Sequence, residues 1–335
     1  MAKYKNTRES YFLGTLTAFS IAYFMTYILG NILIEISNMA HLGLLGQWGQ
    51  FMVTLLGPAI GVGVAYKYGL SYIGILSTML AGSVGLGSLT GADLQVAAPL
   101  MAYLCVLVCM FVLRMLEGKT PIDLFLLPIC SITISGLLRE IVMPYLGMLL
   151  GYIMNMMNSL MNTNPLLMGM AVALVAGLLF TSPITLVAIT SLLDFTPLAC
   201  GAALVGVMSH MLGFGLMSLQ DNDIGDTLAV IFGTSMLQFT NCIKRPVILI
   251  PPVVTSMICG LLSTGLFKIT TTLDAAAMGG TAWIGIFDTV SYMGMQYWIL
   301  PVIGCIILPL VINFSIYQLF RKAGYIRNGD LKLIK

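Results

Sequence analysis

Apolar segments of about 20 residues recur along the whole chain, separated by polar stretches. Of the 335 residues, 59% are hydrophobic and only 8% are charged. A soluble domain is usually about 25% charged, and a single core stops growing at about 250–300 residues. No water-soluble fold would hide this much apolar surface, so lipid is the expected solvent. A signal peptide does not explain the pattern, because the apolar segments are not confined to one end.

The segments are long and apolar on all sides, which predicts an all-α polytopic membrane protein. Strands of a membrane barrel would instead show about ten residues of alternating polarity. Lys67, Arg114, Lys119 and the basic C-terminal end fall on the same side as the basic N-terminus, so both termini are expected in the cytoplasm. The expected crossings are residues 11–36, 47–66, 70–89, 96–113, 124–150, a sixth starting near 166, 198–219, 227–238, 247–267 and 297–319.

The element at residues 227–238 is too short to cross the bilayer comfortably. It is either a tilted half-span or a re-entrant hairpin. Counting it as a crossing gives about ten, the even number that two cytoplasmic termini require. The polar stretch at residues 155–165 is expected outside, between the fifth and sixth crossings.

Several classes of function lack their motifs. The phosphate-binding sequence GxxxxGK[ST] is absent, which argues against a primary pump. The seven cysteines form no CxxC pair and only two histidines occur, so we expect buried cysteines, no metal site and no cofactor. We expect no nucleic-acid partner. The glycines Gly82, Gly85, Gly87 and Gly91 lie in or beside an apolar span, where close helix packing is the better interpretation.

The stretch GTSMLQFTNCIKRPVILIPP, residues 233–252, is unusually polar for such a chain. Gln238 and Asn241 carry amides three residues apart, so on a helix they share one face, with Ser235 one turn earlier. Amides offer donors and acceptors that suit sugar hydroxyls. The Pro251–Pro252 pair suggests a discontinuous helix, a common element of transporter sites. Hydrogen bonding between helices is the alternative role.

Other polar groups at membrane depth are candidates for the same site, because such groups usually line a cavity or bind something. Ser182 precedes Pro183, where a proline kink is the alternative interpretation. His210 lies among small apolar residues and either binds a hydroxylated ligand or only packs. Arg139 and Glu140 are adjacent, so they cannot form a face-to-face pair; they snorkel, or one faces a cavity. The full set of predicted solute-binding residues is Ser182, His210, Asn222, Ser235, Gln238 and Asn241.

The sequences GFGLMS, GTSMLQ, IPP and TGLFK, with an Asn after GTSMLQ, resemble the membrane IIC component of the bacterial phosphotransferase system. LLGPAIGVGVAYKYG and LLFTSPIT are similar to other landmarks of that family. More narrowly, the chain resembles stand-alone IIC-like proteins that include membrane toxin regulators of the perfringolysin-regulator type. The likeness runs from about Gly46 to Phe267.

The resemblance implies a ten-helix IIC-type fold with re-entrant hairpins, a homodimer in a bacterial cell membrane, and an elevator motion that carries a sugar-like solute. It divides the single membrane domain into a scaffold (about 11–150), a transport part (about 165–295) and a last helix (about 297–319). We expect no IIA or IIB domain in this chain, so phosphoryl transfer would need separate partner proteins. The GITE-type sugar-binding motif is also absent, since TSPIT in the comparable place lacks its glutamate.

The first hypothesis is therefore a transporter of a small polar solute, with no catalytic residue of its own. A membrane sensor that controls gene expression through a partner is the second. A membrane enzyme that uses Glu140 or His210 as a base is the third, but the chain shows no nucleophile–base pair.

Overall fold

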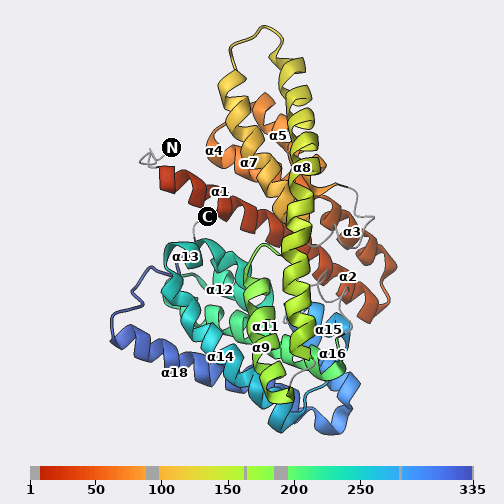
Figure 1. Cartoon of the computed structure of the whole chain (residues 1–335), viewed down its shortest axis with the longest axis vertical. Helices are drawn as coiled ribbons and strands as arrows, with labels where there is room; N and C mark the ends of the chain where they lie inside the picture. Colours follow the sequence, from red (N-terminus) through yellow and green to blue (C-terminus); the bar gives the residue numbers. More distant parts are fainter. Residues whose placement is uncertain (1–7, 88–97, 162–163, 185–194, 279–280, 334–335) are drawn as a thin grey trace. The chain divides into compact units, whose positions relative to one another are not determined.

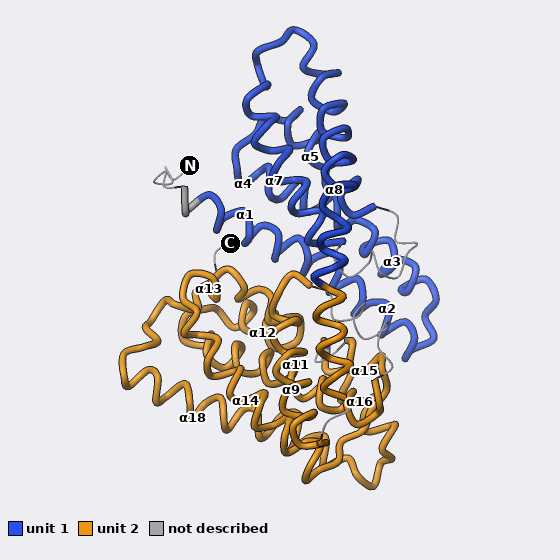
Figure 2. The backbone as a smooth tube through the Cα atoms, in the orientation of Figure 1, with its two compact units in different colours: residues 1–149, 334–335 blue, residues 150–333 orange. Residues whose placement is uncertain are grey.

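The computed structural model describes residues 8–87, 98–161, 164–184, 195–278 and 281–333. These residues are mostly helical and include no β-strand, as Figure 1 shows. The chain divides into two compact units, residues 1–149 with 334–335 and residues 150–333, coloured separately in Figure 2. The predicted all-α class is confirmed.

Unit 1 is built from helices that follow one another with short connections. The first two are joined by a π-helical turn at Phe24–Ile28, and the third and fourth form a pair bent by 49°. The helices are α1 (Arg8–Tyr23), α2 (Leu29–Ala40), α3 (Gly43–Thr54), α4 (Leu56–Tyr68), α5 (Tyr72–Leu86), α7 (Ala98–Leu116) and the first part of α8 (Asp123–Met161).

Glycines let the helices of unit 1 approach closely. A Cβ added at Gly57 of α4 would lie 2.5 Å from the Gly82 carbonyl oxygen of α5, and one added at Gly85 would lie 2.7 Å from the Cα of Ala102 in α7. Only a residue without a side chain permits such backbone contact. The predicted packing role is confirmed for Gly82 and Gly85, whereas Gly91 lies outside the described residues.

Arg139 and Glu140 do not pair with each other. The Nη1 of Arg139 donates to the carbonyl oxygens of Val84 and Gly85, at 3.1 and 3.5 Å, near the C-terminal end of α5. Glu140 is exposed on another face of α8. Arg139 therefore neutralises helix-terminal carbonyls, which carry partial negative charge.

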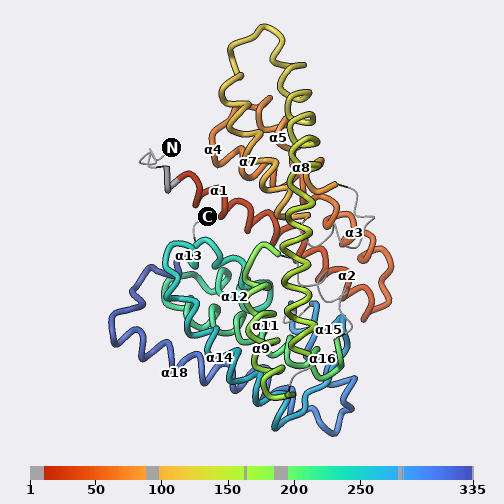
Figure 3. Tube along the Cα trace, in the orientation of Figure 1, coloured from red at the N-terminus to blue at the C-terminus, as the bar shows by residue number. Residues whose placement is uncertain are grey.

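Unit 2 begins within α8 and ends close to the C-terminus, so it combines the middle and the end of the chain (Figure 3). Its longer helices are α9 (Pro165–Thr181), α11 (Pro197–Ser218), α14 (Ile250–Leu262) and α18 (Leu308–Lys322). Its shorter helices are α12 (Ile224–Phe232), α13 (Phe239–Lys244), α15 (Leu273–Met278), α16 (Ile284–Met293) and α17 (Ile299–Val302). Single 3₁₀ turns cover Ser235–Gln238, Pro246–Leu249, Thr281–Trp283 and Met295–Tyr297, and π turns cover Ser263–Phe267 and Ile303–Ile307.

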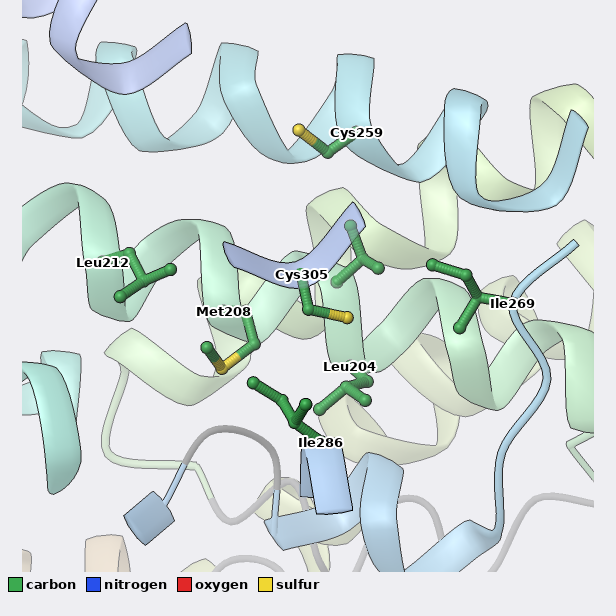
Figure 4. Close-up of a cluster of buried hydrophobic side chains, with 8 residues drawn as sticks. Leu204, Met208, Leu212, Cys259, Ile269, Ile286 and Cys305 are labelled. Carbon is green, nitrogen blue, oxygen red and sulfur yellow. The ribbon is translucent and has the colours of Figure 1, made fainter. Parts of the chain in front are cut away.

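Helix α11 is the central helix of unit 2 and is almost completely buried. One core cluster packs Leu204, Met208 and Leu212 of α11 against Cys259 of α14 and Cys305, as Figure 4 shows. A helix that is apolar all round is buried by its neighbours, which explains why α11 has no polar face.

Six described helical stretches are long and apolar enough to cross a membrane, or up to seven when the bent pair counts as one span. Helices α5 and α9, with 15 and 17 residues, are shorter than a span. The ten expected crossings remain a prediction. The fifth expected crossing is longer than foreseen, because α8 continues to Met161 through residues 155–161 of the polar stretch. Its Asn and Ser side chains do not stop a helix rich in Met and Leu.

Candidate functional site

The polar stretch at residues 233–252 is a discontinuous helix, as its sequence predicts. Helix α12 ends at Phe232, and Thr234 is extended (φ −161°, ψ 141°), with its Oγ1 accepting a hydrogen bond from the Met236 amide at 3.1 Å. The 3₁₀ turn Ser235–Gln238 and helix α13 follow. The proline pair lies in the first turn of α14, where a missing N–H is tolerated.

Three buried polar side chains from three elements form one hydrogen-bonded chain. The Oγ1 of Thr181, at the end of α9, lies 2.9 Å from the Nδ1 of His210 in α11 and 2.9 Å from the Oγ of Ser235. Thr181 also donates to the carbonyl oxygen of Gly177 at 2.9 Å. All three side chains are at most 2% exposed. We call Thr181, His210 and Ser235 the hydroxyl–imidazole cluster.

The bonding capacity of Thr181 fixes the roles of its two neighbours. A hydroxyl donates one hydrogen and accepts two. With its hydrogen directed at Gly177, Thr181 accepts from Ser235 and from the Nδ1–H of His210. In the neutral ring, Nε2 is then an acceptor, and it has no partner among the described residues. A buried acceptor without a partner costs about 1–3 kcal/mol, so this nitrogen could still accept a hydrogen bond from a donor.

The ring of His210 is held against a glycine. A Cβ added at Gly177 would lie 2.4 Å from His210 Cδ2 and 2.7 Å from Nε2. The edge of the ring faces Phe214, with ring centroids 6.1 Å apart. The small residue in α9 therefore makes the space that the imidazole occupies in α11.

Gln238 and Asn241 contact each other, which confirms that they share a face. The Nδ2 of Asn241 donates to the Oε1 of Gln238 at 2.7 Å. The Nε2 of Gln238 donates to the carbonyl oxygen of Leu331 at 2.9 Å, and Asn241 Nδ2 also donates to the carbonyl oxygen of Lys332 at 3.1 Å. Both amides therefore hold the C-terminal segment, defined here as residues 325–333.

Asn222 holds the same segment from the loop after α11. Its Nδ2 donates to the Leu331 carbonyl at 2.8 Å, and its Oδ1 accepts from the Leu333 amide at 2.7 Å. The neighbouring Asp221 accepts from the amides of Gly329 and Leu331, at 2.8 and 3.1 Å. We call Asn222, Gln238 and Asn241 the amide cluster.

Charged and apolar contacts complete the attachment of the C-terminal segment. Arg245 forms an ion pair with Asp330 at 3.3 Å and donates to the Tyr325 carbonyl at 3.2 Å. Ile326 and Leu331 are 2% and 0% exposed, within a core cluster that α11 and α18 also build.

The predicted site residues thus fall into two groups that meet at one turn. Ser235 begins the turn and belongs to the hydroxyl–imidazole cluster, and Gln238 ends it and belongs to the amide cluster. Ser182 stands next to Thr181, but its Oγ bonds only locally, donating to Leu179 O at 2.8 Å and accepting from Ile184 N at 3.3 Å.

Sequence reasoning missed Thr181, Asp221 and the C-terminal segment. Thr181 could have been found, because it opens the TSPIT stretch. The segment gave no local signal, since its partners lie about 90–110 residues earlier in the sequence.

A family model described as phosphotransferase system, EIIC, matches residues 13–333. No curated protein and no solved structure matches the chain. The match covers both units and all the residues of the two clusters. Together with its apolar helices, it shows that this membrane protein belongs to the EIIC family of the phosphotransferase system and is a transporter of that kind.

Proposed function

We propose that this chain carries a sugar or sugar derivative across the bacterial cell membrane by an elevator-type motion. Residues of about 165–295 would move against a scaffold formed by about 11–150, in a homodimer with both termini in the cytoplasm. The division into two compact units, with its boundary between residues 149 and 150, supports such a relative motion. Separate IIA and IIB proteins would supply the phosphoryl group.

The observation that carries the proposal is the open acceptor of His210. Its Nε2 is buried and without a partner among the described residues, and it belongs to a network of neutral hydroxyl and imidazole groups. A sugar hydroxyl would donate to this nitrogen. Ser182 and Ser235 would add further hydroxyl contacts where α9 ends and the broken helix begins.

The neutral character of both clusters favours a neutral solute. Of the two cations that follow the amides, Arg245 is already paired with Asp330 and Lys244 is exposed rather than buried with them. A buried amide or hydroxyl recognises a solute by hydrogen bonds that a less polar analogue cannot replace, which gives strong discrimination.

The amide cluster would join the site in a different conformation. In this structure, the side-chain amides of this cluster donate hydrogen bonds to the carbonyls of Leu331 and Lys332. A solute reaches these donors only after the C-terminal segment leaves. The hydroxyl–imidazole cluster is buried too, but its Nε2 acceptor needs only an approach path, so we assign it to the first contact with the solute and the amide cluster to a later one.

Uptake by the full chain in liposomes tests the proposal. A panel of labelled sugars, organic acids and vitamins is offered, with and without phosphoryl-carrying partner proteins. We expect saturable uptake of a sugar, lost in His210→Asn and retained in His41→Asn, which changes the exposed histidine. If no compound of the panel is bound or taken up, the transporter proposal fails.

A further inference from the structure

A cavity of about 750 Å³ opens within unit 1, far in sequence from the two clusters. Its walls are side chains of α1, α4 and α7, most of them aromatic or aliphatic. The volume falls in the range of about 300–1,000 Å³ that is typical of small-molecule sites.

Three aromatic rings frame the cavity. Tyr68, at the end of α4, makes edge contacts with Tyr11 of α1 and Phe111 of α7, each with ring centroids 5.6 Å apart. Phe12 and Phe111 are 50% and 57% exposed, so the apolar side of this frame is open. Ring contacts help to hold the frame together.

The guanidinium of Arg114 lies against this aromatic frame. The Cζ of Arg114 is 4.7 Å from the Tyr68 ring centroid, and its Nη1 donates to the Tyr68 carbonyl at 3.4 Å. That bond uses one of the five N–H donors of the guanidinium. In the part of the chain that the structure describes, no carboxylate lies within ion-pair distance of Arg114. Glu117, one turn further on, bonds to the amide and hydroxyl of Ser71 instead.

The cavity lies where helices end. Arg114 is in the last turn of the candidate span Ala98–Leu116, and Tyr11 begins the candidate span Tyr11–Ala40. Ends of spans lie at the membrane surface, where Tyr and Arg side chains are enriched. Lys67, whose Cγ is 3.4 Å from a Cβ built at Gly14, adds a second positive charge at this end.

The threonine hydroxyl of the cavity is already hydrogen-bonded. Thr15 already donates to the Phe12 carbonyl at 2.7 Å and is paired with the hydroxyl of Tyr103 at 2.9 Å. The remaining recognition elements are the aromatic frame, which includes the hydroxyls of Tyr11 and Tyr68, and a guanidinium. An amphiphile with an apolar chain and an anionic head matches both.

We propose that this cavity binds one anionic phospholipid, with its phosphate at Arg114 and one acyl chain among the aromatic side chains of α1, α4 and α7. Basic pockets between membrane helices bind anionic headgroups because charge attraction adds to apolar burial. This lipid site is separate from the proposed solute site and does not depend on it.

Native mass spectrometry of the full-length protein tests the proposal. The protein is purified in mild detergent and offered phosphatidylglycerol, phosphatidylcholine or inorganic phosphate. We expect retention of phosphatidylglycerol over phosphatidylcholine, and about a fivefold weaker retention in Arg114→Gln, the effect of one cation near a membrane surface. Phosphate alone should neither bind nor compete, because it lacks the chain.

Arg321→Gln is the matched control. Arg321 also lies over a tyrosine ring at the end of a span, 5.9 Å from the Tyr317 centroid, but it does not line this cavity. A second variant, Leu107→Trp, fills the cavity and keeps Arg114, and it should lose the lipid as well. Thermal unfolding of each variant shows that it is folded.

Three results would overturn the proposal. The first is equal retention of phosphatidylglycerol and phosphatidylcholine. The second is an equal loss in Arg114→Gln and Arg321→Gln, which indicates a general charge effect. The third is a wild-type protein that retains no lipid, combined with a Leu107→Trp variant that has a different number of subunits. That result means that a second copy of the chain covers the cavity.

Discussion

The side-chain amide of Gln238 donates a hydrogen bond of 2.9 Å to the backbone carbonyl of Leu331, 93 residues later in the sequence. Both residues are fully buried. The bond joins the broken helix after α11 to the C-terminal segment. The arrangement of this polar stretch therefore depends on residues near the end of the chain.

Gln238→Ala should destabilise the protein by about 1–3 kcal/mol, since it removes the buried hydrogen bonds to the Leu331 carbonyl and from the Asn241 amide, each worth about 0.5–1.5 kcal/mol. Chemical denaturation in detergent measures the change, and proteolysis near residue 325 detects release of the C-terminal segment. Gln50→Ala, at an exposed glutamine, should change neither. Unchanged stability in Gln238→Ala would contradict the bond.

Leu331→Lys should detach the C-terminal segment, because the Leu331 side chain is 0% exposed and a lysine cannot be buried there unpaired. If the amide cluster also binds solute, its freed donors raise solute affinity in Leu331→Lys, whereas Gln238→Ala and Asn241→Ala lower it. Lys332→Ala, at an exposed side chain, is the control. Isothermal titration with the transported solute distinguishes these outcomes. Normal solute affinity in all the variants means that the amides only hold the segment.

Thr181→Val should abolish solute binding, while Thr181→Ser should preserve it. Valine removes the hydroxyl that accepts from His210 and Ser235, and two buried donors are left without partners at a cost of about 1–3 kcal/mol each. Serine keeps the hydroxyl and loses only a methyl group. Uptake in liposomes and thermal unfolding are measured together. Equal loss of binding in both variants would point to packing rather than to hydrogen bonding.

Gly177→Ala should cost about 1–3 kcal/mol of stability, because the added methyl overlaps the His210 ring and the Gly206 carbonyl. Gly136→Ala is the matched control, since nothing lies within 4 Å of a Cβ at that helical position. The control should be neutral or more stable, because alanine is favoured over glycine in helices by about 1 kcal/mol. Unfolding temperatures compare the two.

The sequence by itself determined the class of the protein. Long apolar segments with few charges require lipid, and in lipid only structures that satisfy every backbone group internally are stable. The local sequence also predicted where helices are interrupted. TSPIT ends α9, and the stretch from Gly233 to Pro252 is discontinuous because Gly and Pro interrupt the helix. The contact between Gln238 and Asn241 followed from their spacing alone.

Only the tertiary structure decided which polar groups meet. Thr181, His210 and Ser235 come from three elements, and their bonds span 29 and 54 residues of sequence. The partners of the amide cluster are backbone carbonyls and amides, which every residue carries, so no side-chain pattern announces them. The cavity at Arg114 likewise exists only because α1, α4 and α7 pack together. Periodicity and composition indicate which solvent a segment faces. A binding site forms where segments far apart in the sequence contact one another.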